Sequence, residues 1–319
     1  MHPYYQAIID VYAQAGRPFF HQVSPEEARE MLRTSLAAAP KPIDLPALAD
    51  VVDETIDGPH GPIPIRRYVP ADSKGTCVYF HSGGWVIGGI DQPDALCRRL
   101  AAAAGCECVS VDYRLAPEHP YPQPLDDAYA ALLWAAENRP GPLLVAGESA
   151  GGNLAAACAI RARDTAGPTL IGQFLAYPVT DSQFDTPSYR EVGDKNLLLS
   201  RADMMWFWDH YCPPDVDRTN AWVSPLRVAD ATGLPPAMIC VAELDPLRDE
   251  GLMFGERLAA AGIPVIIRRD PDVPHGYLAA AGTVEMSTQA VAQAAEWIAT
   301  EIRTSAAVGE PRYEPIDAT

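Results

Sequence analysis

Short apolar runs alternate with longer amphipathic stretches from residue 77 to residue 302, and this alternation restricts the folds open to the chain. The apolar runs have the length of buried strands, and the stretches between them have helical periodicity. The predicted strands cover residues 77–80, 106–111, 143–146, 171–176, 238–242 and 265–268. The predicted helices cover residues 93–104, 125–137, 151–163, 247–261 and 285–302. This pattern predicts an α/β fold with a mostly parallel sheet and helices on both faces.

The residues before this region add two strands and two helices. Residues 51–56 and 63–69 flank a turn rich in Gly and Pro, as in a β-hairpin, which brings the predicted sheet to eight strands. A capping box formed by Ser24 and Glu27 predicts the start of one helix. An earlier helix is predicted by an apolar stripe formed by Tyr5, Ile8, Ile9 and Tyr12.

These patterns divide the chain into three parts. The N-terminal helices cover residues 1–48 and end in a linker rich in proline at residues 40–46. The α/β domain covers residues 49–303, and a break in its alternation predicts a helical insert at about residues 183–222. Residues 304–319 are predicted to form a frayed C-terminal tail.

Charge and cysteine content exclude several classes of partner and site. The chain has 42 Asp and Glu residues against 24 Lys and Arg residues, so its formal charge of −18 repels nucleic acid and anionic membrane surfaces. It has no apolar run of about 18 residues that would suggest a membrane span. None of its seven cysteines forms a Cys-x-x-Cys pair, so we expect buried free thiols and no metal site. Together with the absence of a signal-peptide pattern, this predicts a cytoplasmic protein.

The segment Gly-Glu-Ser-Ala-Gly at residues 147–151 matches the pattern G-x-S-x-G between a predicted strand and a predicted helix. At such a turn the serine is strained and exposes its hydroxyl, and its neighbours must be small. Gly147, Ala150 and Gly151 meet this demand. We therefore predict that Ser149 is a nucleophile, with an ordinary glycine-rich turn as the alternative interpretation.

A nucleophilic serine needs a base and an acid that orients the base. Of the seven histidines, His275 follows the last predicted strand, at the sheet edge where active sites of this fold class form. Asp245 follows the preceding strand and is the predicted orienting acid. Three nearby acids compete with it for this role: Glu243, Asp249 and Glu250. The chain order Ser149, Asp245, His275 is the order expected of an α/β-hydrolase fold.

The sequence His-Ser-Gly-Gly-Trp at residues 81–85 follows the strand at residues 77–80. Glycines in such a loop bring backbone amides close to a substrate. We predict that the amides of Gly83, Gly84 and Ala150 form an oxyanion hole, in which losing one donor typically costs ~2.7–4 kcal/mol of transition-state stabilisation. His81 is expected to brace the loop by hydrogen bonding.

Together these segments resemble the hormone-sensitive-lipase-like family of α/β-hydrolases, the bacterial carboxylesterases. The resemblance runs from about residue 51 to residue 302. It rests on the segments at residues 81–85, 112–122, 147–153, 245–249 and 275–276. The family implies the Ser149–Asp245–His275 triad, the oxyanion donors named above and no cofactor. It also implies a helical cap, built here from the N-terminal helices and the insert.

The chain departs from the family at one position and leaves several side chains without an assigned chemistry. The family's oxyanion loop usually reads His-Gly-Gly-Gly, and Ser82 replaces its first glycine, so we expect hydrolysis to survive and esters of bulky alcohols to be affected. Asp112 and Glu118 are expected to pair with Arg114. Aromatic residues line a substrate pocket or pack in the cap, and the pocket candidates are Trp85, Trp206, Trp208 and Tyr177.

The sequence therefore predicts a carboxylic-ester hydrolase that acts on short- to medium-chain acyl esters through an acyl-enzyme intermediate. Its expected partner is a small-molecule ester, and the family suggests a homodimer formed through the last strand, at residues 265–268. Two alternatives stay open. One is an amide or formamide hydrolase, which would prefer a formanilide to phenyl esters. The other is a binding protein that has kept the pocket and lost the chemistry.

Overall fold

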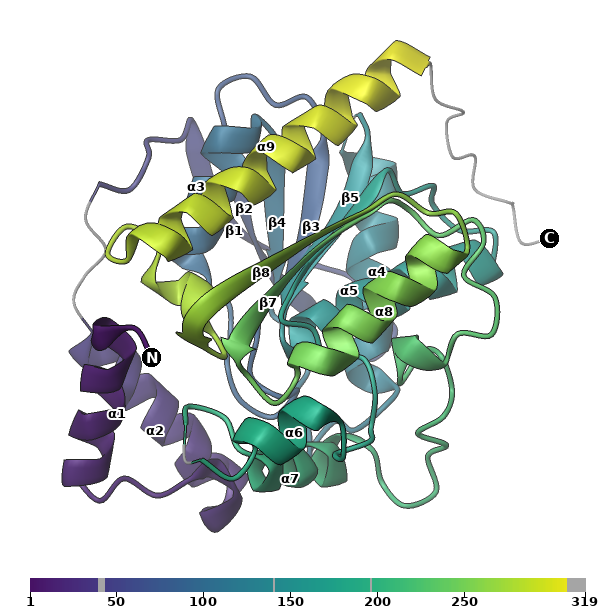
Figure 1. The fold of residues 1–319 in the computed structure, drawn as a ribbon. Coiled ribbons are helices and arrows are strands. Elements are labelled where there is room, and N and C mark those ends of the chain that lie inside the picture. Colours follow the sequence, from purple (N-terminus) through teal and green to yellow (C-terminus); the bar gives the residue numbers. More distant parts are fainter. Residues whose placement is uncertain (40–43, 140, 196, 309–319) are drawn as a thin grey trace.

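The computed structural model describes residues 1–39, 44–139, 141–195 and 197–308, and within them eight strands form one sheet in the order β1-β2-β4-β3-β5-β6-β7-β8 (Figure 1). The first four strands are β1 (Asp50–Ile56), β2 (Ile63–Val69), β3 (Thr76–Phe80) and β4 (Glu107–Val111). The other four are β5 (Leu143–Glu148), β6 (Gly172–Ala176), β7 (Ala237–Leu244) and β8 (Val265–Pro274). Strand β2 is antiparallel to both neighbours and all other pairs are parallel, which confirms the predicted mostly parallel sheet.

Helices cover both faces of the sheet, as predicted (Figure 1). One face carries α3 (Asp94–Ala104) and α9 (Glu285–Val308), and the other carries α4 (Gln123–Asn138), α5 (Ala150–Asp164) and α8 (Arg248–Ala260). Successive residues of β3 point to opposite faces of the sheet. Val78 packs on the face covered by α4, α5 and α8, and Tyr79 packs on the face covered by α3 and α9. A strand buried on both faces needs apolar residues at every position, which explains the unbroken apolar runs in the sequence.

Two predicted boundaries shift by more than two residues in the structure. Strand β8 continues to Pro274, beyond its predicted end at residue 268, because the ladder with β7 extends through a polar stretch that carries no strand pattern. Helix α9 ends at Val308, so the prediction of a tail from residue 304 is wrong for residues 304–308. The remaining tail residues, 309–319, and linker residues 40–43 lie outside the described part of the chain.

The cap combines helices from two distant parts of the sequence. The N-terminal part contains α1 (Pro3–Gln14), the short helix η1 (Phe20–Gln22) and α2 (Pro25–Ala38), and the insert contains α6 (Pro187–Val192) and α7 (Arg201–Tyr211). The predicted capping box is present at α2, where Ser24 and Glu27 each accept the other's amide. Figure 1 shows both parts lying at the end of the sheet toward which β7 and β8 point. The cap thus covers the edge where active sites of parallel sheets form.

Polar side chains tie the N-terminal part of the cap to the rest of the molecule. Arg29 on α2 donates to both carboxylate oxygens of Glu118, at 2.8 and 2.6 Å, and to the carbonyl of Val86 at 2.9 Å. The predicted pairing of Glu118 and Asp112 with Arg114 is therefore wrong. Arg114 pairs with buried Asp127. Asp112 instead accepts the amide of Ile90 at 3.2 Å.

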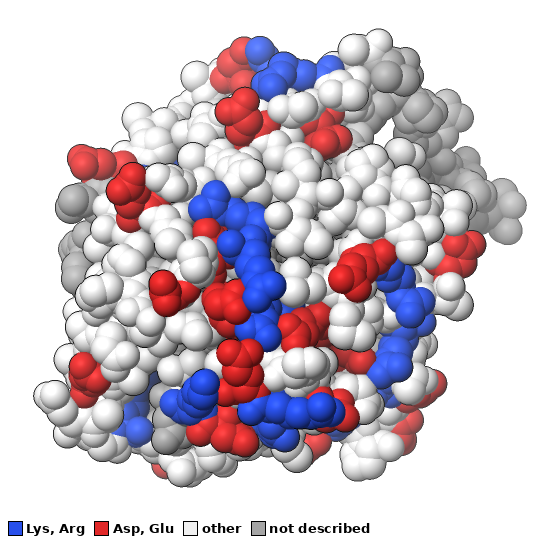
Figure 2. Space-filling model, viewed as in Figure 1, with Lys and Arg blue, Asp and Glu red and all other residues white. Residues whose placement is uncertain are grey.

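Charges of both signs are interleaved on the surface seen in Figure 2, where Lys and Arg side chains lie beside Asp and Glu rather than in a broad basic patch. Among the described residues, no helix combines the length and apolar character needed to cross a membrane. All seven cysteines are free and buried, as the sequence predicts.

Candidate active site

Ser149 occupies a sharp turn between β5 and α5. Its φ of 55° and ψ of −118° are unusual for a residue with a side chain, and its amide donates to the carbonyl of Ala176 at 2.9 Å. A Cβ atom at Gly147 would clash with the backbone of Gly151, and one at Gly151 would clash with the carbonyl of Phe80. The small neighbours in the motif are thus needed because two backbone segments pass close to this turn.

The structure brings Ser149, His275 and Asp245 together. Ser149 Oγ lies 2.9 Å from His275 Nε2, and His275 Nδ1 lies 2.7 Å from Asp245 Oδ2. Strand register explains the second contact. Leu244, the last residue of β7, pairs with Pro274, the last residue of β8, so Asp245 and His275 follow directly after a paired position. Asp245 is fully buried, and its other oxygen accepts the amide of Leu247 at 2.9 Å.

This serine and histidine are almost enclosed. Ser149 is 5% exposed and the His275 side chain is 14% exposed. A low-dielectric setting strengthens hydrogen bonds among such groups. The arrangement can therefore carry a proton from the serine hydroxyl to the imidazole while the carboxylate fixes the ring.

The three competing acids have other partners among the described residues. Glu243 pairs with Arg248 and Arg269 on the outside of the sheet. Asp249 accepts the amide of Ser188 in the cap insert at 2.6 Å. Glu250 accepts the amide of Thr180 at 2.7 Å. Asp249 and Glu250 thus brace segments near the site, Glu243 joins β7 to α8 and β8, and none of the three has a hydrogen bond or ion pair to His275 among the described residues.

The loop after β3 lies beside the nucleophile turn, because Phe80 of β3 pairs with Gly147 of β5. Gly83 has a φ of 126°, and a Cβ atom there would clash with the carbonyl of Ile87. Gly84 has a φ of 58°, and a Cβ atom there would meet the ring of Phe207 from the cap. Only glycine fits at both positions, because the Ile87 backbone and the Phe207 ring occupy the space that a side chain would need.

Ser82 and His81 brace the same loop. The Ser82 hydroxyl accepts from the side-chain amide of Gln92 at 2.7 Å, an interaction that a glycine at this position would lack. The buried His81 ring stacks on Tyr113, and its Nδ1 lies 2.7 Å from the Ser82 carbonyl. Burial lowers the pKa of His81 to about 4, so this imidazole is neutral at neutral pH. Its contacts match the bracing role expected from the sequence.

The four pocket candidates occupy different environments. Trp85 and Trp208 are fully buried and pack on one another, with ring centroids 5.0 Å apart. Trp206 is partly exposed and contacts His210. Tyr177 is buried with its ring against His275. Packing thus accounts for Trp85 and Trp208, which is the alternative that the sequence left open.

Two pockets are lined by residues other than these four. A pocket of about 600 Å³ in the cap has a mostly apolar wall, with Tyr12, Phe20, Leu32 and Leu198 among its lining residues. Phe20 also contacts Phe207, which in turn covers Gly84 of the loop after β3. The cap pocket is thus separated from that loop by aromatic rings.

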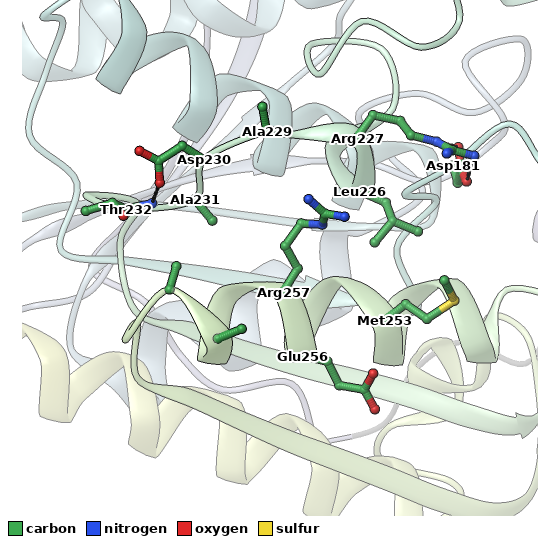
Figure 3. A pocket seen from close by; sticks show the side chains of 12 residues that line it. Asp181, Leu226, Arg227, Ala229, Asp230, Ala231, Thr232, Met253, Glu256 and Arg257 are labelled. Atoms are coloured by element: carbon green, nitrogen blue, oxygen red, sulfur yellow. Dashed lines mark hydrogen bonds and ion pairs between the residues drawn. The ribbon is translucent and has the colours of Figure 1, made fainter.

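The second pocket, of about 710 Å³, lies between α8 and the short helix η2 (Pro225–Arg227) (Figure 3). Arg257 reaches across it from α8, and Arg227 pairs with Asp181 at its rim (Figure 3). None of the three residues brought together above lines it. Among the described residues, no group of three or more His, Cys, Asp or Glu side chains could hold a metal ion.

One buried carboxylate beside the nucleophile escaped the sequence analysis. Glu148 is buried next to Ser149 in the chain, and its two oxygens accept the hydroxyls of Tyr79, at 2.6 Å, and Tyr177. An acidic residue at the end of an apolar strand was the available signal. Such a residue is buried, and a buried carboxylate requires hydrogen-bond donors nearby. The tyrosines lie on neighbouring strands in space but far away in sequence.

Comparison with known proteins places this site in a family. A model of the α/β-hydrolase fold matches residues 77–279. Esterase LipI of Mycobacterium tuberculosis is 41% identical over 280 residues, which cover 84% of this chain and 87% of LipI. Ethyl acetate hydrolase of Pseudomonas putida is 32% identical over 308 residues, which cover 92% of this chain and 95% of that enzyme. The crystal structure of an esterase from Pyrobaculum calidifontis superposes with a TM-score of 0.87 at 36% identity, covering 94% of this chain and 98% of that one.

Proposed function

This chain belongs to the α/β-hydrolase family and is a carboxylesterase, and from this we propose that it cleaves its esters through a Ser149–His275–Asp245 triad and an acyl-enzyme intermediate. The observation that carries the proposal is the continuous chain of contacts from Ser149 Oγ through both nitrogens of His275 to buried Asp245.

In the first half of the reaction, His275 Nε2 removes the Ser149 proton as Oγ attacks the ester carbonyl carbon. The carbonyl π electrons move to oxygen, and the tetrahedral intermediate forms. His275 then returns the proton to the leaving alcohol as the ester C–O bond breaks, which leaves an acylated serine. Water repeats the sequence on the acyl group, so that a carboxylic acid is released and the free serine is restored. Asp245 holds the ring in one tautomer and stabilises the imidazolium.

The negative oxygen of the tetrahedral intermediate needs hydrogen-bond donors. We assign this role to the amides of Gly83, Gly84 and Ala150. Ala150 opens α5, so its amide has no partner within that helix. Gly83 and Gly84 lie on the loop that begins beside the nucleophile turn. Within the described residues, no carbonyl accepts from any of these three amides.

The expected substrates are short- to medium-chain acyl esters. The cap covers the sheet edge, and Ser149 and the His275 side chain are only 5% and 14% exposed, which suits small substrates. The name of the similar Pseudomonas enzyme refers to a small ester, ethyl acetate. Long-chain emulsions turned over faster than butyrate esters would contradict this preference.

The decisive experiment compares the wild type with Ser149→Ala on p-nitrophenyl butyrate at about pH 8. We expect the variant to lose at least ~10³-fold in kcat, because the nucleophile is absent. Equal and slow rates for both proteins, with a ligand still bound, would overturn the proposal in favour of a binding protein.

We also propose that two copies associate through β8 in the cytoplasm. Strand β8 ends the sheet, and Ile266 and Ile267 on it are 43% and 40% exposed. An open edge with apolar side chains is a template for pairing. Seven free cysteines suit a reducing compartment. A single-chain mass by light scattering would dismiss the dimer.

A further inference from the structure

Glu148, the second residue of the G-x-S-x-G motif, has no part in the proton transfers described above, and yet it is buried directly behind them. Its strand ends where the nucleophile turn begins, so its side chain lies on the face covered by α3 and α9. Burying a carboxylate is costly unless donors satisfy it. Here each oxygen has one donor, Tyr79 on β3 and Tyr177 after β6.

Tyr177 connects this carboxylate to the catalytic histidine. Its backbone has a φ of 37°, a strained value for a tyrosine, and its amide donates to the carbonyl of Cys240 at 2.6 Å. Its ring meets the His275 ring edge-on, with centroids 4.9 Å apart and an interplanar angle of 64°. The ring of Tyr277 contacts Tyr177 at 5.7 Å. Tyr177 is therefore fixed at its backbone, its hydroxyl and its ring.

We propose that Glu148 is a positioning residue for His275: through Tyr177 it holds the imidazole against Ser149, and its negative charge favours the imidazolium that forms during each proton transfer. This inference rests on the proposed triad. In this arrangement two carboxylates orient His275 and stabilise its protonated form. Asp245 accepts a hydrogen bond from Nδ1 directly. Glu148 acts indirectly, by holding Tyr177 and by the electrostatic attraction between its negative charge and the imidazolium.

The charge of Glu148 depends on its surroundings. Burial raises its pKa, and the hydrogen bonds from Tyr177 and Tyr79, followed by the nearby His275, work in the opposite direction. An ionised carboxylate accepts through both oxygens, and the contacts of Tyr79 and Tyr177, one at each oxygen, provide it with two donors. On α3, Cys97 also faces the pair, and its thiol has a pKa raised by burial. The titratable groups around His275 are thus Asp245, Ser149, Tyr177 and Glu148.

The test replaces the carboxylate with its neutral isostere, Glu148→Gln, and follows kcat/KM for p-nitrophenyl butyrate from pH 5 to pH 9. Removing a negative charge disfavours protonation of the base, so the midpoint of the acidic limb is expected to move to lower pH. We expect kcat to fall about tenfold with KM little changed. Glu148→Asp keeps the charge and should retain the wild-type position of the acidic limb. An unchanged limb with kcat within twofold of wild type in Glu148→Gln would overturn the proposal.

Tyr177→Phe supplies a second test that removes only a hydroxyl, in case Glu148→Gln does not fold. It should lower kcat at constant KM, because the ring is no longer anchored to the carboxylate. Its matched control is Tyr68→Phe, which removes a buried phenol that donates to Asp94 at 3.0 Å, away from the site. If the control lowers kcat as much as Tyr177→Phe at equal Tm, the role of Glu148 is structural only.

Labelling with diethyl p-nitrophenyl phosphate separates this proposal from the proposed function. The reagent should phosphorylate Ser149 in the wild type, with release of one p-nitrophenolate per active site. If the wild type is neither labelled nor active, the triad itself is wrong and Glu148 has no base to position. If the wild type is labelled and active but the Glu148 variants match it, only the positioning role is wrong.

Discussion

The proposed catalytic groups and the cap are held in place by different kinds of interaction. Ser149, Asp245 and His275 each directly follow a strand of the sheet, and backbone ladders fix where those strands end. Within the described residues, the N-terminal part of the cap has one backbone hydrogen bond to the body, from His2 to Asp272, and its other hydrogen bonds to the rest of the molecule involve side chains. Arg29 contacts Glu118, and His21 Nδ1 lies 2.8 Å from Asp203 on α7.

This difference predicts that the bond-breaking steps and the binding of substrate depend on different parts of the molecule. A ladder position cannot move without disturbing the neighbouring strands, so the triad geometry is tied to the stability of the whole domain. A helix held by a few side chains can loosen while the domain stays folded. The comparison therefore predicts that changes in the body alter kcat or global stability, whereas changes at the cap contacts alter substrate binding.

Asp245→Asn should give the largest effect. It tests the prediction for the residues that the strands of the sheet hold in place. The Asp245 carboxylate accepts from both Nδ1–H and the Leu247 amide, whereas asparagine has a single oxygen; when that oxygen accepts from Leu247, the NH₂ group faces Nδ1 and the imidazole adopts the wrong tautomer. Loss of the acid in a serine triad lowers kcat by about 10⁴-fold, and we expect a loss of that order on p-nitrophenyl butyrate. Asp249→Asn in the first turn of α8 is the matched control, since Asp249 contacts Ser188 and not His275. Equal losses in the two variants would show that loop stability, rather than the acid on the histidine, limits the rate.

The parts that follow from one segment at a time were predictable from the sequence. Strands buried on both faces are visible as apolar runs, and residues that directly follow parallel strands converge at one sheet edge. Asp245 and His275 could be matched for this reason, before their register through Leu244 and Pro274 was known.

Pairings between segments that are distant in sequence could not be predicted in this way. Glu118 lies close to Arg114 in sequence but pairs with Arg29, because α2 of the cap packs over its loop. The tyrosines of Glu148 come from β3 and from the residue after β6, and no local pattern connects them. Sequence proximity is a poor guide wherever a side chain leaves its own element.

Glu250→Gln is expected to have a smaller effect, on stability and not on chemistry. Glu250 is fully buried, one of its oxygens accepts from Thr180, and the other has no hydrogen-bond partner among the described residues. Burial raises its pKa well above the ordinary value, and the carboxylates of Asp181 and Asp245 add to the effect. A raised carboxyl pKa means that the folded state binds more protons than the unfolded state, so stability falls as pH rises above the unfolded value of ~4.3.

The glutamine has no such titration. The variant should therefore gain stability relative to the wild type as pH rises, by up to about 1.4 kcal/mol per pH unit between the unfolded and folded pKa values. Urea unfolding at pH 5, 6, 7 and 8 measures this difference. Glu256→Gln, at an exposed position on the same helix, should leave the pH slope unchanged. A constant difference between Glu250→Gln and the wild type at all four pH values would show that Glu250 is ionised in the folded state.

Arg29→Met should have the smallest effect and tests the cap side of the comparison. The variant keeps the apolar stem of the side chain and loses its hydrogen bonds to Glu118, Val86 and Ala116. Since Glu118 is more than half exposed, the lost ion pair contributes about 1 kcal/mol or less. We expect an increase of about threefold in KM for p-nitrophenyl butyrate, with kcat close to wild type, because a loosened α2 weakens the substrate-binding wall but not the triad.

Arg33→Met is the matched control for this prediction, because Arg33 lies on the same helix and, within the described part of the chain, its hydrogen bonds go to Glu30 of that helix. It should leave both kinetic constants unchanged. The Arg29 contact to Val86 also reaches the loop that carries Gly83, since the Val86 amide donates to the Gly83 carbonyl at 3.0 Å. A fall in kcat at constant KM in Arg29→Met would contradict the prediction that the cap contacts affect substrate binding alone. It would mean that the cap helps to hold the loop with Gly83 and Gly84 in its active conformation.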